Sequence, residues 1–213
     1  MPAAAAMRGD ITYSGRARRV AVLRCLVAAL VVTILLAGVA ALIFWLVVRP
    51  KPIDYTVTRA VARHFNVTPP QPDDATANAT FYLTLAANNP NRRVSILYEW
   101  VEFRVLYGEG EAQLATGEAP AFAQPHRNET RLDVRAVARS VHVGEQTARE
   151  LRQDLAAGQV GVDVRMHARV QFKVAGVRSR RYYIEAFCSP VVIGLAPSSA
   201  RSFQSVPCDA AIS

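Results

Sequence analysis

The chain has 213 residues, enough for one or two domains, and a formal net charge of +8 at pH 7. Residues 1–24 carry five arginines against Asp10, or +4, and residues 49–213 carry twenty basic and sixteen acidic side chains, again +4. The uncharged stretch between these two basic parts excludes a wholly soluble chain.

This stretch, CLVAALVVTILLAGVAALIFWLVV, covers residues 25–48 and has no charged side chain in its 24 residues. A helix rises about 1.5 Å per residue, so the stretch reaches roughly 36 Å and crosses a hydrocarbon core of about 30 Å. A cleaved signal peptide has a shorter apolar region, of about 7 to 15 residues, and ends in small residues. Because the stretch is longer and ends at Arg49, it is predicted to be a signal anchor, that is, a transmembrane helix.

The charges beside this helix predict its orientation. Five arginines precede it, whereas Arg49 and Lys51 behind it are soon followed by Asp54. Because cytoplasmic flanks retain arginine and lysine, residues 1–24 are expected to form a basic cytosolic tail and residues 49–213 to be translocated. The sequence therefore predicts a single-pass membrane protein with a translocated C-terminal domain.

Sequons and cysteines agree with translocation. Three N-x-Ser/Thr sequons lie after the helix, at Asn66, Asn78 and Asn128, and are candidates for N-glycosylation. Cys188 and Cys208 are the two cysteines of the translocated part, and an oxidising compartment would pair them, with two buried free thiols as the alternative. A disulfide that closes a loop of this size contributes about 3 kcal/mol in the chain-entropy model.

Strand patterns dominate the translocated part. Apolar and polar residues alternate over residues 81–87, 101–107 and 132–138, and turn residues bound each segment. The longest alternation, residues 160–174, has apolar even positions that face a core and mostly polar or basic odd positions that face outward. Ala175-Gly176 then predicts a tight hairpin into a second strand.

One helix is predicted in this part, over residues 145–157. About seven strands with one short helix favour a mainly β fold, an antiparallel β-sandwich of the fibronectin-III or immunoglobulin-like kind. The predicted domains are the cytosolic tail at 1–24, the transmembrane helix at 25–48, a linker with the first strand at 49–75, and the sandwich at 76–213, to which the strand from about residue 53 also belongs.

No constellation for catalysis or metal binding can be read from the sequence. It lacks a G-x-S-x-G elbow, a Gly-rich phosphate loop and an H-E-x-x-H motif, and its four histidines fall on separate segments. The chain is therefore expected to be no enzyme and to need no cofactor. Basic stretches at Arg92-Arg93, at 178–181 and on the odd face of 160–174 would suggest nucleic acid in a soluble protein, but translocation excludes that partner. The odd face is expected to be solvated, and contact with anionic lipid or an acidic polymer is the alternative.

The order of motifs resembles that of a plant family. An N-P-N turn followed by a basic residue precedes a Tyr-acidic pair, and a Phe-x-Gln segment leads into an N-x-T sequon. These motifs resemble the harpin-induced, non-race-specific disease resistance-like family, whose extracytoplasmic part is a late embryogenesis abundant group 2 domain. The matching residues are Asn89, Pro90, Asn91, Arg92, Tyr98, Glu99, Phe122, Gln124, Asn128 and Thr130.

The resemblance implies a non-enzymatic, single-pass plasma-membrane protein of plant defence and stress responses, with an extracellular sandwich that binds a protein, wall-polymer or lipid partner. Proline cannot donate to a sheet and asparagine tolerates left-handed backbone, so the N-P-N motif is expected to end one strand and turn into the next. Two other functions stay open, a lipid-handling sandwich with an apolar groove between its sheets and an unrecognised membrane-anchored hydrolase or transferase. Homo-oligomerisation also stays open.

Overall fold

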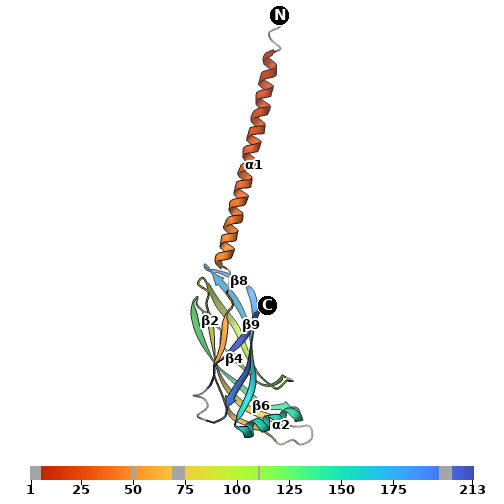
Figure 1. The fold of residues 1–213 in the computed structure, drawn as a ribbon, viewed down its shortest axis with the longest axis vertical. Coiled ribbons are helices and arrows are strands. Elements are labelled where there is room, and N and C mark those ends of the chain that lie inside the picture. The colour runs from red at the N-terminus through yellow and green to blue at the C-terminus, as the bar shows by residue number, and fades with distance from the viewer. Residues whose placement is uncertain (1–5, 49–50, 69–74, 110, 197–202) are drawn as a thin grey trace. The chain divides into compact units, whose positions relative to one another are not determined.

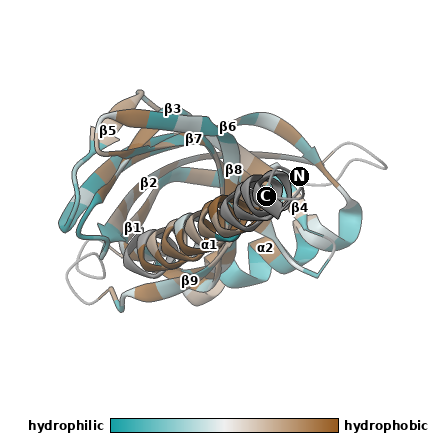
Figure 2. Ribbon diagram, turned by 90° about the horizontal axis from the view of Figure 1, so that it is seen from above, coloured by the Kyte–Doolittle hydropathy of each residue, from teal (hydrophilic) through white to brown (hydrophobic). Residues whose placement is uncertain are grey.

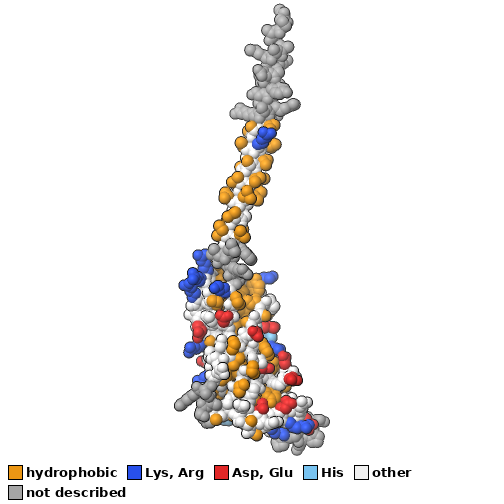
Figure 3. Space-filling model, viewed as in Figure 1, with side chains coloured by type: hydrophobic (Ala, Val, Ile, Leu, Met, Phe, Trp, Pro, Cys, Tyr) orange, Lys and Arg blue, Asp and Glu red, His pale blue; other side chains and the backbone are white. Residues whose placement is uncertain are grey.

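A computed structural model describes residues 6–48, 51–68, 75–109, 111–196 and 203–213, with side chains in the N-terminal helix described from residue 20 to residue 43. Two compact units divide the chain, Met1–Arg49 and Pro50–Ser213. The first unit contains the helix α1 (Ala6–Val48). Within it, Val20–Ile43 is long and apolar enough to cross a membrane, and none of this stretch is buried in the structure. Figure 3 shows hydrophobic side chains along this stretch, with a basic side chain near its N-terminal end.

The helix α1 begins earlier than the predicted boundary at residue 25. It includes residues 6–24, which the sequence assigned to a cytosolic tail. The alanine and arginine residues of this segment have high helix propensity, and a helix that has already formed extends easily through such residues. The apolar composition therefore bounds the candidate membrane span Val20–Ile43, and the helix continues beyond it toward the N-terminus.

The second unit is an antiparallel β-sandwich with one short helix (Figure 1). Neighbouring strands follow the order β4-β6-β2-β1-β9-β8-β7-β3-β5, and β4 also pairs with β3. The sheet thus folds into two layers, β1-β2-β6 and β3-β7-β8, which β4 joins at one edge and β9 at the other. The elements are β1 (Asp54–Val67), β2 (Ala75–Asn89), β3 (Val94–Tyr107), β4 (Ala112–Ala119), β5 (Phe122–Gln124), β6 (Asn128–Val143), α2 (Glu145–Ala157), β7 (Gln159–Val174), β8 (Val177–Gly194) and β9 (Val206–Ile212).

The predicted sandwich is confirmed, with nine strands in the described residues where the sequence indicated about seven. Every second side chain of a strand faces the core between the layers. Figure 2 shows hydrophobic and hydrophilic residues following one another along β3. In β7, the even-numbered side chains from Val160 to Val170 are at most 2% exposed. Phe81 of β2 and Phe103 of β3 are both fully buried. Burying one such large apolar side chain stabilises the fold by roughly 1.5–3 kcal/mol.

The outward face of β7 is less solvated than the sequence predicted. Its residues from Asp163 to Gln171 are half-buried, because β3 and β8 flank the strand on both sides. Arg165 Nη2 lies 2.7 Å from Glu111 Oε1, and Arg169 Nε lies 3.0 Å from Glu99 Oε2. Acidic side chains on neighbouring segments therefore compensate the positive charge of this face.

The predicted hairpin and the predicted second helix are confirmed. Ala175 and Gly176 connect β7 to β8 with φ values of 49° and 89°, the left-handed backbone of a two-residue hairpin turn. Helix α2 buries Ala148 and Leu151, and Gly158 ends it with a φ of 78°.

Glycine is also required where β4 closes the sandwich. The strand β4 pairs with β3 along most of its length and meets β6 at Thr116 and Val137. A Cβ atom on Gly117 would lie 2.7 Å from the carbonyl oxygen of Arg135, so the two backbones approach too closely for any side chain.

Candidate functional site

Six of the ten motif residues come together at one end of the sandwich, where β2 ends and β3 and β5 begin: Asn89, Pro90, Asn91, Tyr98, Phe122 and Gln124. Asn89 and Gln124 are fully buried, Tyr98 is 1% exposed and Asn91 is 7% exposed. Pro90 lies between the two asparagines and Phe122 is half-buried beside them in β5. Since burying a polar side chain without partners is unfavourable, their hydrogen bonds show what this cluster does.

Asn89 uses both ends of its side-chain amide. Its Nδ2 donates to the carbonyl oxygens of Val94, at 2.9 Å, and Pro125, at 3.0 Å. Its Oδ1 accepts from the backbone nitrogen and from Nδ2 of Asn91, at 3.1 Å and 3.0 Å. Asn89 therefore holds the turn between β2 and β3 against the segment that follows β5.

Asn91 connects the same turn to the start of the domain. Its Nδ2 donates to the carbonyl oxygen of Lys51 at 3.0 Å, and the backbone nitrogen of Lys51 donates to Asn91 Oδ1 at 2.7 Å. The backbone nitrogen of Arg127 donates to the Asn91 carbonyl oxygen at 3.0 Å. The N-P-N motif thus fixes three segments that are distant in the sequence, which goes beyond the turn that was predicted for it.

Gln124 and Tyr98 extend this cluster into the core. Gln124 Nε2 donates to the carbonyl oxygens of Ala87, at 2.7 Å, and Asn128, at 3.0 Å. The Tyr98 hydroxyl donates to Gln124 Oε1 at 3.3 Å and lies 2.7 Å from the Tyr55 hydroxyl. The Phe122 ring stacks on Tyr98 with centroids 4.2 Å apart. These partners satisfy the buried polar groups within the fold, so the cluster stabilises the sandwich and offers no free group to a ligand.

The buried tyrosine pair makes the domain less stable at high pH. Burial raises the pKa of Tyr98 to about 12, and burial beside Tyr98 raises the pKa of Tyr55 further above its usual range. Both hydroxyls are therefore neutral in the fold but ionise near pH 10 in the unfolded chain. Their contribution to stability is complete below about pH 10 and is lost as the pH rises toward the folded pKa values.

We expect the free energy of unfolding to fall between pH 10 and pH 11.5 by up to roughly 1.4 kcal/mol per pH unit for each buried tyrosine. Urea unfolding of the full chain in a neutral detergent, followed by near-UV circular dichroism, measures this slope. Tyr98→Phe should make this slope smaller by the contribution of one buried tyrosine, up to roughly 1.4 kcal/mol per pH unit. The exposed Tyr183 provides the control, because Tyr183→Phe should leave the slope unchanged. Equal slopes for wild type and Tyr98→Phe would contradict the assignment.

A second region lies on the outer face of the β1-β2-β6 layer. A groove of about 730 Å³ opens there, and residues 194–196, at the end of β8, contribute to its wall. We call it the arginine groove. The side chains that give it its chemistry are Arg59, Arg63, Tyr82, Thr84, Asp133 and Arg135.

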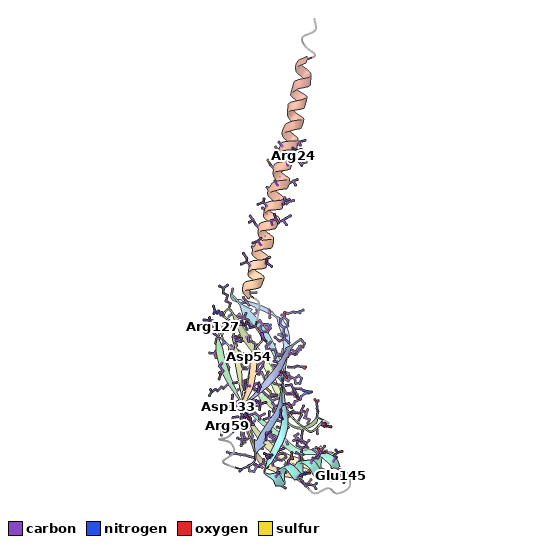
Figure 4. All side chains as sticks on the ribbon, viewed as in Figure 1. Arg24, Asp54, Arg59, Arg127, Asp133 and Glu145 are labelled. Carbon is purple, nitrogen blue, oxygen red and sulfur yellow. A yellow bond between two sulfur atoms is a disulfide. The ribbon has the colours of Figure 1, made fainter. Side chains whose placement is uncertain are left out.

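The strand register brings these side chains together. Arg59 of β1 pairs with Thr84 of β2, which pairs with Asp133 of β6. Tyr82, two residues before Thr84 on the same face, pairs with Arg135. Figure 4 shows Arg59 and Asp133 on the same side of the sandwich.

The arginine groove has a surplus of positive charge. Its three arginines are exposed, and no carboxylate among the described residues forms a salt bridge with them. The Arg63 guanidinium lies over the Tyr82 ring, 5.6 Å from its centroid, and Tyr82 is 40% exposed. Asp133 Oδ1 accepts a hydrogen bond from the Thr84 hydroxyl at 2.7 Å. The groove can therefore bind an anion by guanidinium forks and a ring or hydroxyl group by Tyr82 and Asp133.

Sequence reasoning missed this groove. The basic stretches that it identified were elsewhere, and Arg165 and Arg169 of β7 are paired with glutamates. Arg59 and Arg63 do lie four residues apart on one strand, which puts them on one face. Their proximity to Tyr82 and Arg135 depends on pairing between three strands, which the sequence does not specify.

The remaining predicted site residues are the two cysteines and the sequon asparagines, of which Asn128 adjoins the buried cluster through its carbonyl oxygen. Cys188 of β8 and Cys208 of β9 form a disulfide in the structure, with Cα atoms 4.1 Å apart. Asn66 and Asn128 are exposed, whereas Asn78 is half-buried and its Oδ1 accepts from the backbone nitrogen of Ser140 at 2.8 Å. No group of three His, Cys, Asp or Glu side chains suited to a metal ion occurs within the described part of the chain.

Comparisons with known proteins identify the family. A protein-family model described as "Late embryogenesis abundant protein" matches residues 84–188. An uncharacterized protein of Arabidopsis thaliana is 34% identical over 90% of this chain and 84% of its own length. NDR1/HIN1-like proteins 10 and 3 of the same plant are 29% and 28% identical, over 92% and 84% of this chain and 86% and 77% of their own lengths. These matches confirm the resemblance carried by the N-P-N and Phe-x-Gln motifs. The chain belongs to the late embryogenesis abundant family that includes the NDR1/HIN1-like proteins.

Proposed function

We propose that this chain is a single-pass plasma-membrane protein of plant defence and stress responses, and that its extracellular sandwich binds an anionic partner without catalysis. The observation that carries the binding function is the arginine groove, in which three exposed arginines, without acidic partners among the described residues, surround an exposed tyrosine. Family membership supports the biological setting, and the apolar stretch Val20–Ile43 supports the membrane anchor.

The orientation rests on independent features of the chain. The excess of arginine before the span favours a cytosolic N-terminus. Asn66 and Asn128, both in sequons, are exposed and accessible to glycosylation. The disulfide between Cys188 and Cys208 fits an oxidising compartment. A glycosylated extracellular domain accounts for all of these features.

Binding on the outer face is favoured over binding between the layers. A lipid-handling sandwich would need an apolar groove between its two sheets, and the large side chains there are packed against one another. Tyr55, Phe81 and Phe103 are at most 1% exposed. The buried polar cluster around Asn89 is likewise closed, because its donors and acceptors are used within the fold.

Removing the charge of the groove tests this function. We expect the triple variant Arg59→Gln, Arg63→Gln, Arg135→Gln of the full chain to reach the plant-cell surface normally but to lose its immune-response output. Surface replacements change stability by less than about 0.5 kcal/mol, so misfolding would not explain the loss. Protease added to sealed, right-side-out vesicles measures surface abundance and orientation together.

The matched control removes the same charge elsewhere. Arg92→Gln, Arg93→Gln, Arg178→Gln changes three exposed arginines outside the groove. Equal output from both triple variants would contradict the groove as the binding site. Protection of residues 50–213 from the protease would contradict the extracellular orientation.

A further inference from the structure

We infer that the arginine groove binds a chain of uronic acid residues, that is, an acidic oligosaccharide whose sugars carry carboxylates. This inference rests on the proposed function and specifies its ligand. It follows from three properties of the groove: its uncompensated arginines, its mixture of charged and neutral binding groups, and the distance over which the arginines are spread.

The arginines select a carboxylate or a similar oxyanion. A guanidinium group presents donors in a planar fork that matches the two oxygens of a carboxylate. Arg59, Arg63 and Arg135 have no salt-bridge partner within the described chain, so these forks are available. Asp133 is the one acidic side chain among the described residues that line the groove, so these residues leave two positive charges for a ligand.

The other side chains favour a sugar over a simple anion or an acidic peptide. Tyr82 lines the groove and is 40% exposed, so it offers an aromatic ring and a hydroxyl, and aromatic side chains combine an apolar face with a polar end. Asp133 retains an oxygen that can accept from a ligand hydroxyl, since Thr84 donates to the other oxygen. A cluster of phosphates or glutamates would meet repulsion from Asp133 and supply no hydroxyl for it. A uronate has both a carboxylate and hydroxyl groups.

The spacing favours an oligomer. Arg59 and Arg63 are four residues apart in a regular part of β1, which separates their Cα atoms by about 13 Å. A ligand with anionic groups at separate points can pair with both arginines without drawing their side chains together. The groove volume of about 730 Å³ lies within the usual range of roughly 300–1,000 Å³ for ligand sites. A short run of linked uronates satisfies both conditions.

Titration calorimetry of the full chain in a neutral detergent tests the inference. The probes are a galacturonate hexamer, its methyl ester, a neutral glucose hexamer and a glutamate hexapeptide. We expect the galacturonate hexamer to bind, and the methyl ester and both other probes to bind at least roughly tenfold more weakly. Higher salt should weaken the binding of galacturonate, because the contacts are solvent-exposed charge pairs.

Variants distinguish specific binding in the arginine groove from nonspecific electrostatic attraction of the anionic probe to the basic protein. The groove triple variant at Arg59, Arg63 and Arg135 should lose roughly tenfold or more in affinity, whereas the control triple variant at 92, 93 and 178 should lose less than about twofold. Tyr82→Ala should weaken binding, and Tyr82→Phe should retain most of it. Equal binding of the glutamate peptide, equal losses in both triple variants, or no binding of galacturonate would each overturn the inference.

Failure of this inference can be separated from failure of the proposed function. If galacturonate does not bind but the groove triple variant still loses immune output in plant cells, the groove is a binding site for a different partner. If galacturonate binds as expected and the groove triple variant keeps its output, the site exists but does not serve the proposed function.

Discussion

Replacing Asn89 with alanine is expected to lower the free energy of unfolding of the sandwich by about 4 kcal/mol. The Asn89 side chain makes four hydrogen bonds and is fully buried. Alanine removes all four and leaves buried partners without their bonds, among them the carbonyl oxygen of Val94 and an amide donor of Asn91. An orphaned buried donor or acceptor costs about 1–3 kcal/mol, which is why the loss exceeds that of an ordinary hydrogen bond.

The neighbouring Asn88 supplies a matched control. It is the same residue type on the same strand but is exposed, so Asn88→Ala should change stability by less than about 0.5 kcal/mol. Urea unfolding of the two full-length variants in detergent measures the difference, and surface abundance in plant cells should follow it. A loss of similar size in both variants would show that the buried hydrogen bonds of Asn89 are not what stabilises this end of the sandwich.

The layers of the fold could be predicted because each depends on local periodicity. Residues 160–174 alternate over their whole length, and the hairpin at Ala175-Gly176 has a turn that suits left-handed backbone. The edges could not be predicted in the same way. Strand β5 has three residues, too few for a period, and β9 follows a segment rich in serine and proline. Both strands are specified by the partners they pair with.

The candidate site was harder to predict than the fold because it depends on contacts between distant segments. The motif around Asn89 was visible, but Lys51 and Tyr55 complete its hydrogen bonds from the other end of the domain sequence. Many of the partners are backbone carbonyls, which have no signature in a sequence. In the arginine groove, Arg59 of β1 and Arg135 of β6 are separated by four other strands in the chain, and a register shift of one residue would turn their side chains to the opposite face.

Replacing Val164 with aspartate is expected to prevent the domain from accumulating at the cell surface. Val164 lies in the middle of β7 and is 1% exposed, and its neighbours across the sheet, Val105 and Cys188, are fully buried. A carboxylate there either remains charged without a partner or is neutralised by taking up a proton, and both outcomes are unfavourable. An uncompensated buried charge costs about 3–5 kcal/mol, a large part of the roughly 5–15 kcal/mol that stabilises an ordinary domain.

An aspartate introduced at an exposed position of β7 separates the effect of burying the new charge from the effect of the charge itself. Lys173 lies on the outward face of β7 and is exposed, so Lys173→Asp should leave both the urea midpoint and surface abundance close to those of the wild type. Val164→Ala, which removes apolar volume without adding a charge, should give an intermediate loss. The order of stability expected is therefore Lys173→Asp, then Val164→Ala, then Val164→Asp. Normal surface abundance of Val164→Asp would mean that the even-numbered face of β7 does not pack the core, and would overturn the placement of this strand in the sandwich.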